Sequence, residues 1–146
     1  MGWDEYFIEH SKLVARKSKD KHTKVGCVIV GPKNEVRSTG YNNLPRGAND
    51  SIQERYERPE KYFFFEHSEI NAICNAARVG IPLEGCRIYI TMFPCINCAR
   101  AIIQAGIVEI TAPVPNLESD QWGEGFKRAL RLFQELGIKM NYIGER

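Results

Sequence analysis

The chain has 146 residues, of which 43% are hydrophobic and 26% are charged. This length and composition predict one globular domain, spanning residues 1–146, with a core of its own. The formal net charge is only +2, which excludes the globally basic surface typical of nucleic-acid-binding proteins, so we expect a small-molecule partner and no nucleic acid.

The cysteines and the N-terminus indicate in which cellular compartment the protein works. Five cysteines, an odd number, follow an N-terminus that carries acidic residues and no apolar run, which argues against a secreted disulfide framework. No segment approaches the ~20 consecutive apolar residues of a membrane helix. We therefore expect a reduced, cytoplasmic protein that does not engage a membrane.

Hydrophobic periodicity predicts four helices and five strands. In chain order these are a helix at 3–18, strands at 25–30 and 35–41, a helix at 67–79, a strand at 87–92, a helix at 95–105, a strand at 107–114, a helix at 125–136 and a strand at 138–143. Residues 42–66 show no clear period, and a connection of this length is usually functional or partly disordered. A hairpin followed by alternating helices and strands predicts an α/β fold, a three-layer α/β/α sandwich with a five-stranded mixed sheet.

Cys95 and Cys98 form the strongest chemical signal. Positions three apart on a helix share a face, so both sulfurs can reach one ion. A lone C-x-x-C motif fits three readings, namely a redox pair, half of a structural zinc site and an apolar helix face. A structural zinc site would need four protein ligands, and a second close Cys or His pair is missing from the sequence.

His67 and Glu69 distinguish between these readings. They open the preceding predicted helix, and the starts of two consecutive helices in this layout can meet at one edge of the sheet. His67, Cys95 and Cys98 would then give zinc three ligands and leave a fourth position for water, as in catalytic zinc sites. H-x-E followed by P-C-x-x-C is the signature of zinc-dependent nucleobase deaminases.

The chemistry explains these residue types. The amino-bearing carbon of the base is a poor electrophile, so the reaction needs an activated water and a group that moves protons. We expect Glu69 to take the water proton, deliver it to the ring nitrogen and then protonate the departing amine. We also expect the Ser68 amide to bind the 2-oxo oxygen of a pyrimidine, and the Phe93 carbonyl to accept from its amino group.

At this point the sequence resembles the cytidine and deoxycytidylate deaminase superfamily, and within it the deoxycytidylate (dCMP) deaminases, over nearly its whole length. The resemblance rests on the zinc signature, residues 23–30, Gly40–Gly47, Arg58–Tyr62 and His67–Ile73. It implies the cytidine deaminase-like fold and zinc-dependent hydrolysis of dCMP to dUMP and ammonia, which supplies dUMP for thymidylate synthesis.

The resemblance also implies substrate contacts. Asn42 would bind the sugar, although Asn is also common in turns. The 5′-phosphate needs cationic or N–H donors, and the sequence does not rank its five candidates. These are Lys24, Arg46, Arg55, Arg58 and Lys61.

Relatives of this kind are often hexamers, activated by dCTP and inhibited by dTTP bound with Mg²⁺. The resemblance places that effector site near the Gly40–Gly47 segment, which includes Tyr41, and implies that Arg78 senses a neighbouring subunit.

Two residues depart from the family pattern. Ser68 stands where relatives usually have alanine, and Asn43 stands where they usually have glycine. Residues 42–66 contain neither His nor Cys, so we expect one zinc per chain and not the second zinc of some viral relatives.

Three alternatives remain open at this stage. Another deaminase substrate is possible, either dCTP, a cytosine nucleoside or, less consistent with the weakly basic tail at 141–146, an adenosine in tRNA. A non-catalytic zinc module would not need Glu69. A thiol oxidoreductase would use Cys95 and Cys98 without metal and would give His67 no role.

Overall fold

The computed structural model describes residues 1–144. Its regular elements follow the order expected from the sequence, with two additional short helices, η1 and α2, between β2 and α3. They are α1 (Trp3–Ala15), β1 (Gly26–Val30), β2 (Val36–Tyr41), η1 (Gln53–Tyr56), α2 (Lys61–Phe64), α3 (Ser68–Val79), β3 (Arg87–Ile90), α4 (Ile96–Gln104), β4 (Glu109–Pro113), α5 (Gly123–Glu135) and β5 (Lys139–Ile143).

The five strands form one mixed sheet in the order β2-β1-β3-β4-β5. β1 runs antiparallel to both neighbours, whereas β3, β4 and β5 are parallel. All five residues of β1 are buried, and alternate residues point to opposite faces of the sheet, as in a strand covered on both sides. The mixed five-stranded sheet predicted from the sequence is confirmed.

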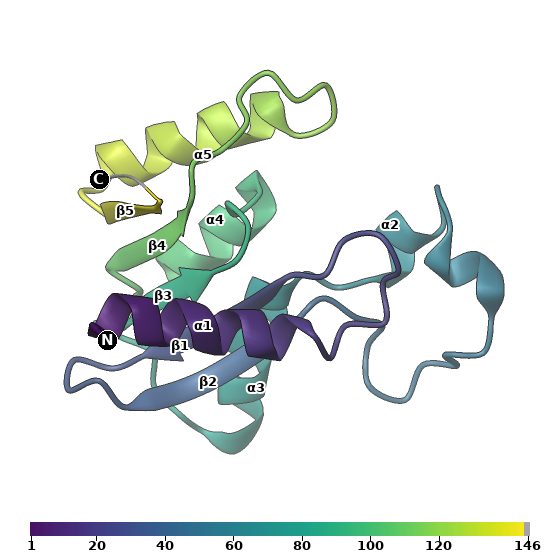
Figure 1. The fold of residues 1–146 in the computed structure, drawn as a ribbon, viewed down its shortest axis with the longest axis horizontal. Helices are drawn as coiled ribbons and strands as arrows, with labels where there is room; N and C mark the ends of the chain where they lie inside the picture. The colour runs from purple at the N-terminus through teal and green to yellow at the C-terminus, as the bar shows by residue number, and fades with distance from the viewer. Residues whose placement is uncertain (145–146) are drawn as a thin grey trace.

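Helices cover both faces of this sheet (Figure 1). On one face α1 packs Phe7 and Ile8 against Val28, Val30 and Tyr89. On the other face α3, α4 and α5 enclose the larger core, which contains the remaining inward side chains of the strands. That core includes Cys27, Ile29, Ala72, Ile88, Ile90, Ala99, Ile102, Ile110, Phe126 and Phe133. The molecule is therefore the three-layer α/β/α sandwich expected from the element order.

Gly40 brings β2 and α3 into close contact. A Cβ atom at this position would lie 2.2 Å from the Ser68 carbonyl oxygen and 2.5 Å from the Ala72 amide nitrogen. Only glycine allows two backbones to approach this closely. Because Ser68 lies in the first turn of α3, this contact fixes the start of that helix against the sheet.

Residues 42–66 extend beyond the end of the sheet and carry η1 and α2 (Figure 1). This segment returns to β2 through paired backbone hydrogen bonds between Asn43 and Glu66, 3.1 and 2.8 Å long. Glu145 and Arg146, the end of the tail that we judged too weakly basic for RNA, lie outside the described residues. Within residues 1–144, no helix combines the length and apolarity needed to cross a membrane.

Candidate active site

The side chains of His67, Cys95 and Cys98 meet at the N-terminal ends of α3 and α4. Nδ1 of His67 lies 3.4 Å from Sγ of Cys95 and 3.4 Å from Sγ of Cys98. Tetrahedral zinc with its usual bond lengths to sulfur and nitrogen requires an N···S separation of about 3.6 Å. The three ligand atoms therefore fit a zinc ion. Among the His, Cys, Asp and Glu side chains within residues 1–144, these three residues are the group that lies close enough together to hold a metal.

The helix starts explain this convergence. His67 and Cys95 are the N-cap residues of α3 and α4, with extended backbones (ψ 153° and 169°), and Cys98 lies in the first turn of α4. The sequence prediction had placed His67 and Cys95 inside the helices, which is wrong by one residue at each start. As caps, both side chains lie at the end of the helix that faces the cavity, with Cys98 one turn further on.

The three groups are hydrogen-bonded to one another, and a metal ion would have to displace the protons that His67 and Cys98 hold. The hydrogen bond from Cys98, with that from His67, lowers the pKa of Cys95 to about 4. The contact with Cys95 raises the pKa of Cys98 and, together with the negative charge of Cys95, raises the pKa of His67 to about 9. Cys95 is thus held as a thiolate, the form that binds metals, against a neighbouring proton donor.

Glu69 is buried beside this triad, with 4% of its surface exposed. Burial raises the pKa of its carboxyl, against the hydrogen bond from Ser68 and the charge of His67, which lower it. The Ser68 hydroxyl donates to Oε1 of Glu69. A carboxyl with a raised pKa, fixed by a neighbouring hydroxyl, is suited to accept and return a proton.

A cavity of about 160 Å³ opens onto these groups. Its wall combines the reactive residues with aromatic and cationic ones from the 20–25 segment, the end of β2, the 58–65 segment and the start of α5. The lining residues are Asp20, Thr23, Val25, Asn42, Arg58, Lys61, Tyr62, Phe65, His67, Ser68, Glu69, Met92, Phe93, Cys95, Gln121, Trp122 and Phe126.

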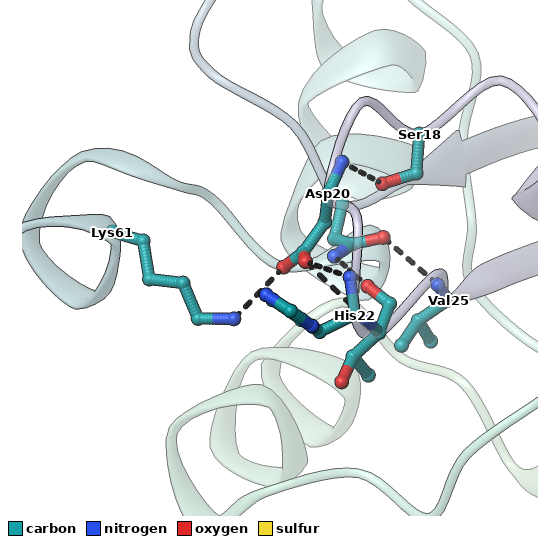
Figure 2. A network of polar contacts seen from close by, with 7 residues as sticks. Ser18, Asp20, His22, Val25 and Lys61 are labelled. Carbon is teal, nitrogen blue, oxygen red and sulfur yellow. Dashed lines mark hydrogen bonds and ion pairs between the residues drawn. The ribbon is translucent and has the colours of Figure 1, made fainter. Parts of the chain in front are cut away.

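One wall of this cavity is a polar network (Figure 2). Nζ of Lys61 lies 3.3 Å from Oδ2 of Asp20, and both residues are buried. The side-chain amide of Asn42 accepts from the Val25 amide and donates to the Thr23 carbonyl. The network joins three chain segments that are far apart in the sequence.

Comparison with known proteins places this arrangement in a family. Residues 1–113 match the cytidine and deoxycytidylate deaminase zinc-binding region. The chain belongs to the cytidine and deoxycytidylate deaminase family. The zinc-dependent deaminase expected from the sequence is thereby confirmed as an enzyme class, and the open alternatives of a thiol oxidoreductase and a non-catalytic zinc module lose their main support.

The deaminase is similar to proteins from several organisms. It is 38% identical over 142 residues to the "uncharacterized deaminase in luxG 3′ region" of Aliivibrio fischeri, covering 97% of this chain and 93% of that protein. It is 39% identical over 113 residues to human deoxycytidylate deaminase, covering 74% of this chain but only 62% of the human protein. A structure of dCMP deaminase from the cyanophage S-TIM5 with dCMP and dUMP shares the fold, with a TM-score of 0.76 at 22% identity and 95% of each chain covered.

The structure brings some of the other predicted substrate residues of the deaminase into the cavity. Asn42, Ser68 and Phe93 line it, as do Arg58 and Lys61 among the phosphate candidates. The amide group of Asn42 is engaged with the backbone of Thr23 and Val25, so its observed role is to shape the cavity wall.

The other cationic candidates lie elsewhere. Lys24 is exposed and is not among the described residues that line the cavity, because its neighbours in the extended 23–25 segment face inward instead. Arg46 lines a second cavity of about 230 Å³, together with Tyr41. The guanidinium of Arg55 donates to the Asn49 carbonyl and lies 4.5 Å from the ring centre of Phe64. Arg78 is exposed in the last turn of α3.

Several residues of the cavity were not identified as site residues from the sequence, among them Asp20 and three residues from the segment after β4. Asp20 pairs with a lysine 41 positions away, which no local pattern predicts. Gln121, Trp122 and Phe126 come from the segment after β4, and the ring of Trp122 lies 6.2 Å from that of His67. A general rule could have indicated this segment, because ligands of open α/β sheets bind beyond the carboxyl ends of the parallel strands.

Proposed function

We propose that this deaminase hydrolyses dCMP to dUMP and ammonia, and so supplies dUMP for thymidylate synthesis. The observation that carries the proposal is a single cavity that joins a zinc-binding triad and a buried carboxyl to two cationic side chains, Arg58 and Lys61. The human relative named deoxycytidylate deaminase and the phage structure with dCMP and dUMP support the same substrate.

His67, Cys95 and Cys98 would hold the zinc, one ion per chain. Bound there, zinc supplies a Lewis acid that lowers the pKa of water from ~16 toward ~7. Trp122 packs edge-on against His67, and Phe93 and Phe126 are in edge-on contact at 5.5 Å, so one side of the cavity is apolar. An apolar wall suits a flat base and limits the water that can enter.

Glu69 would carry both protons of the reaction. Its carboxylate takes a proton from the attacking water and gives it to N3 of cytosine as the C4–O bond forms. It then takes the second proton from that oxygen and gives it to the amino nitrogen as the C4–N bond breaks. The products are dUMP and ammonia, and Glu69 returns to its starting state.

The remaining groups of the cavity would orient the nucleotide. The backbone amide of Ser68 and the backbone carbonyl of Phe93 would bind the 2-oxo and amino groups of the base. Asn42 would shape the sugar subsite. Lys61 and Arg58 would bind the phosphate, because a dianion needs cationic donors when it leaves water.

We propose as well that effector nucleotides occupy the second cavity, which Tyr41, Asn43, Arg46 and Lys19 help to line. Within residues 1–144, the buried Oδ1 of Asn43 has no hydrogen-bond partner, so a ligand with an N–H group would satisfy it. The effectors would be dCTP and dTTP, the latter with Mg²⁺, acting on a hexamer in which Arg78 faces a neighbouring subunit.

The proposal includes one deaminase domain over residues 1–146 and a reducing, cytoplasmic setting. Zinc binding by Cys95 and Cys98 supports that setting, because the ligands must be free thiols or thiolates. All five cysteines are free in the structure.

The test is ammonia release by the zinc-loaded protein from dCMP, dCTP, deoxycytidine, cytidine and adenosine in parallel. The proposal predicts the highest kcat/KM for dCMP, and opposite rate changes when dCTP or dTTP with Mg²⁺ is added. If dCTP or a nucleoside leads, the deaminase chemistry stands and the substrate is wrong. If dCMP leads but neither triphosphate changes the rate, the effector site is wrong.

A further inference from the structure

A buried ion pair lies in the wall of the active-site cavity. Lys61 is 8% exposed and Asp20 is 5% exposed, with Nζ and Oδ2 3.3 Å apart. Removing two charges from water costs more free energy than a simple ion pair usually returns. A buried pair that also lines a cavity is therefore better explained by a role toward a ligand than by stability alone.

Asp20 is held firmly by its own segment. Its Oδ1 accepts from the amides of His22 at 2.9 Å and Thr23 at 3.2 Å, and its own amide donates to the Ser18 hydroxyl at 3.2 Å (Figure 2). One carboxylate oxygen is thus committed to the backbone, and the other contacts Lys61. The direction of the carboxylate is set before any ligand binds.

Asn42 anchors the same segment to the sheet. Its Oδ1 accepts from the Val25 amide at 2.8 Å, and its Nδ2 donates to the Thr23 carbonyl at 2.9 Å. Asn42 follows β2, whose Gly40 packs against the start of α3, where Glu69 lies. Asp20 therefore lies in a rigid frame that also carries the proton-moving carboxylate.

The Lys61 ammonium has hydrogen-bond donors that Asp20 does not use. This group carries three N–H bonds, and within residues 1–144 its hydrogen bond goes to Oδ2 of Asp20. The other donors are available to an anion in the cavity that Lys61 lines. Lys61 belongs to α2, a helix of only four residues, so this short element depends on contacts such as the one with Asp20 to fix its position.

We infer that Asp20 is a positioning residue that acts through Lys61, and that this pair sets the preference for a nucleotide over the corresponding nucleoside. Asp20 holds the Lys61 ammonium in the wall of the cavity that Glu69 also lines, where it would meet the 5′-phosphate of a bound nucleotide. The inference rests on the proposed function, since it assumes a cytosine nucleotide in this cavity. It adds a residue 41 positions from Lys61 to the determinants of specificity.

The experiment compares ligands that differ only in the phosphate. Calorimetry gives the Kd of dUMP and of deoxyuridine for the zinc-loaded protein, and kinetics give kcat and KM for dCMP and deoxycytidine. Lys61→Met should lower the preference for the phosphorylated ligand about 10- to 100-fold, the usual effect of losing a charged hydrogen bond. The loss should appear in KM, with kcat and nucleoside binding nearly unchanged.

Lys33→Met is the matched control. It removes the same charge from an exposed residue in the turn between β1 and β2, at the opposite end of these strands from Val25 and Asn42. It should leave the preference unchanged. An equal loss in both variants would show a general charge effect and would overturn the inference.

Asp20→Asn tests whether Asp20 acts through Lys61. The asparagine keeps an oxygen for the amides of His22 and Thr23 but removes the charge that faces Lys61. The preference should fall about 3- to 10-fold, as expected for a weakened charged contact, and the same substitution should have no further effect on it in the Lys61→Met background.

Three results would overturn this inference: an unchanged preference in Lys61→Met, a preference that rises in Asp20→Asn, or equal losses for nucleotide and nucleoside. Nucleoside binding reports whether each variant still folds. The failure of the proposed function looks different, because the wild-type protein would then release ammonia faster from dCTP or a nucleoside than from dCMP, or from none of them.

Discussion

The pKa and the position of the Glu69 carboxyl depend on its burial and on its neighbour Ser68. Burial raises the pKa of the Glu69 carboxyl, and the Ser68 hydroxyl holds one of its oxygens. The usual alanine at position 68 would leave the backbone amide in place but remove that hydroxyl. Ser68, the residue before the proposed proton carrier, therefore both lines the cavity and restrains the Glu69 carboxyl.

The first prediction at the residue scale concerns Asp20 and acid. Burial raises the pKa of this carboxyl, but the amides of His22 and Thr23 and the ammonium of Lys61 together outweigh burial and hold the pKa below its ordinary value of 3.8. A lowered pKa in the folded state contributes stability above the unfolded pKa, and this stability is lost as the pH falls through the folded pKa.

Urea unfolding of wild type and Asp20→Asn between pH 3 and pH 7 measures this contribution. The difference in unfolding free energy should be constant, about 1–3 kcal/mol, from pH 5 to 7, and should shrink below about pH 4. Both proteins carry the same zinc ligands, so the difference isolates Asp20. A difference that is as large at pH 3 as at pH 6 would show that the pKa is not lowered.

At the scale of elements, the starts of α3 and α4 form the candidate active site, and we expect the packing of these helices to control its activity. Gly40→Ala would place a methyl group within 2.5 Å of backbone atoms at the start of α3. We expect a loss of about 1–3 kcal/mol in unfolding free energy and a lower kcat, because Glu69 moves with that turn.

Gly125→Ala is the matched control for Gly40→Ala. Its nearest new neighbour is a side-chain methyl of Ile96 at 3.6 Å, an ordinary contact. In a helix this change should be neutral or stabilising by up to ~1 kcal/mol. If the two substitutions have equal effects, the close approach of β2 and α3 is not what positions the site.

Zinc removal tests the link between the same two helices. Cys98→Ala should lose the metal and the activity, and its Tm should fall by roughly 5–10 °C, since ~2–3 kcal/mol has this effect in a domain of this size. Cys74→Ala alters an exposed cysteine of α3 and should keep metal, activity and Tm. Differential scanning calorimetry with zinc analysis measures all of these, and an unchanged Tm in Cys98→Ala would contradict a metal that joins the helices.

The elements also show what the sequence could and could not predict. The order of the long helices and strands follows from the hydrophobic period, and the spacing of His67, Cys95 and Cys98 identified the group that could hold a metal. The caps His67 and Cys95 were placed inside helices because the first hydrogen bond of a helix leaves no trace in the hydrophobic pattern. α2 was missed because four residues are too short for a period, and Asp20 because its partner is brought to it only by the tertiary fold.

At the scale of the whole molecule, six stretches of chain that are distant in sequence line one cavity. The starts of α3 and α4 supply the groups proposed to react, and the 20–25 segment and α2 supply the wall with the Asp20–Lys61 ion pair. Lys24 and Arg46 were candidates for the phosphate because of their charge, but whether a charge faces the cavity depends on the path of the extended loops.

The central claim is that Glu69 moves the protons of a zinc-dependent deamination of dCMP. The most direct measurement is ammonia release from dCMP by wild type and Glu69→Gln, each with its zinc content determined. We predict one zinc per chain in both proteins and a loss of kcat of about 10²–10⁴-fold in the variant, the usual contribution of general acid–base catalysis. Equal turnover at equal zinc content would contradict the account.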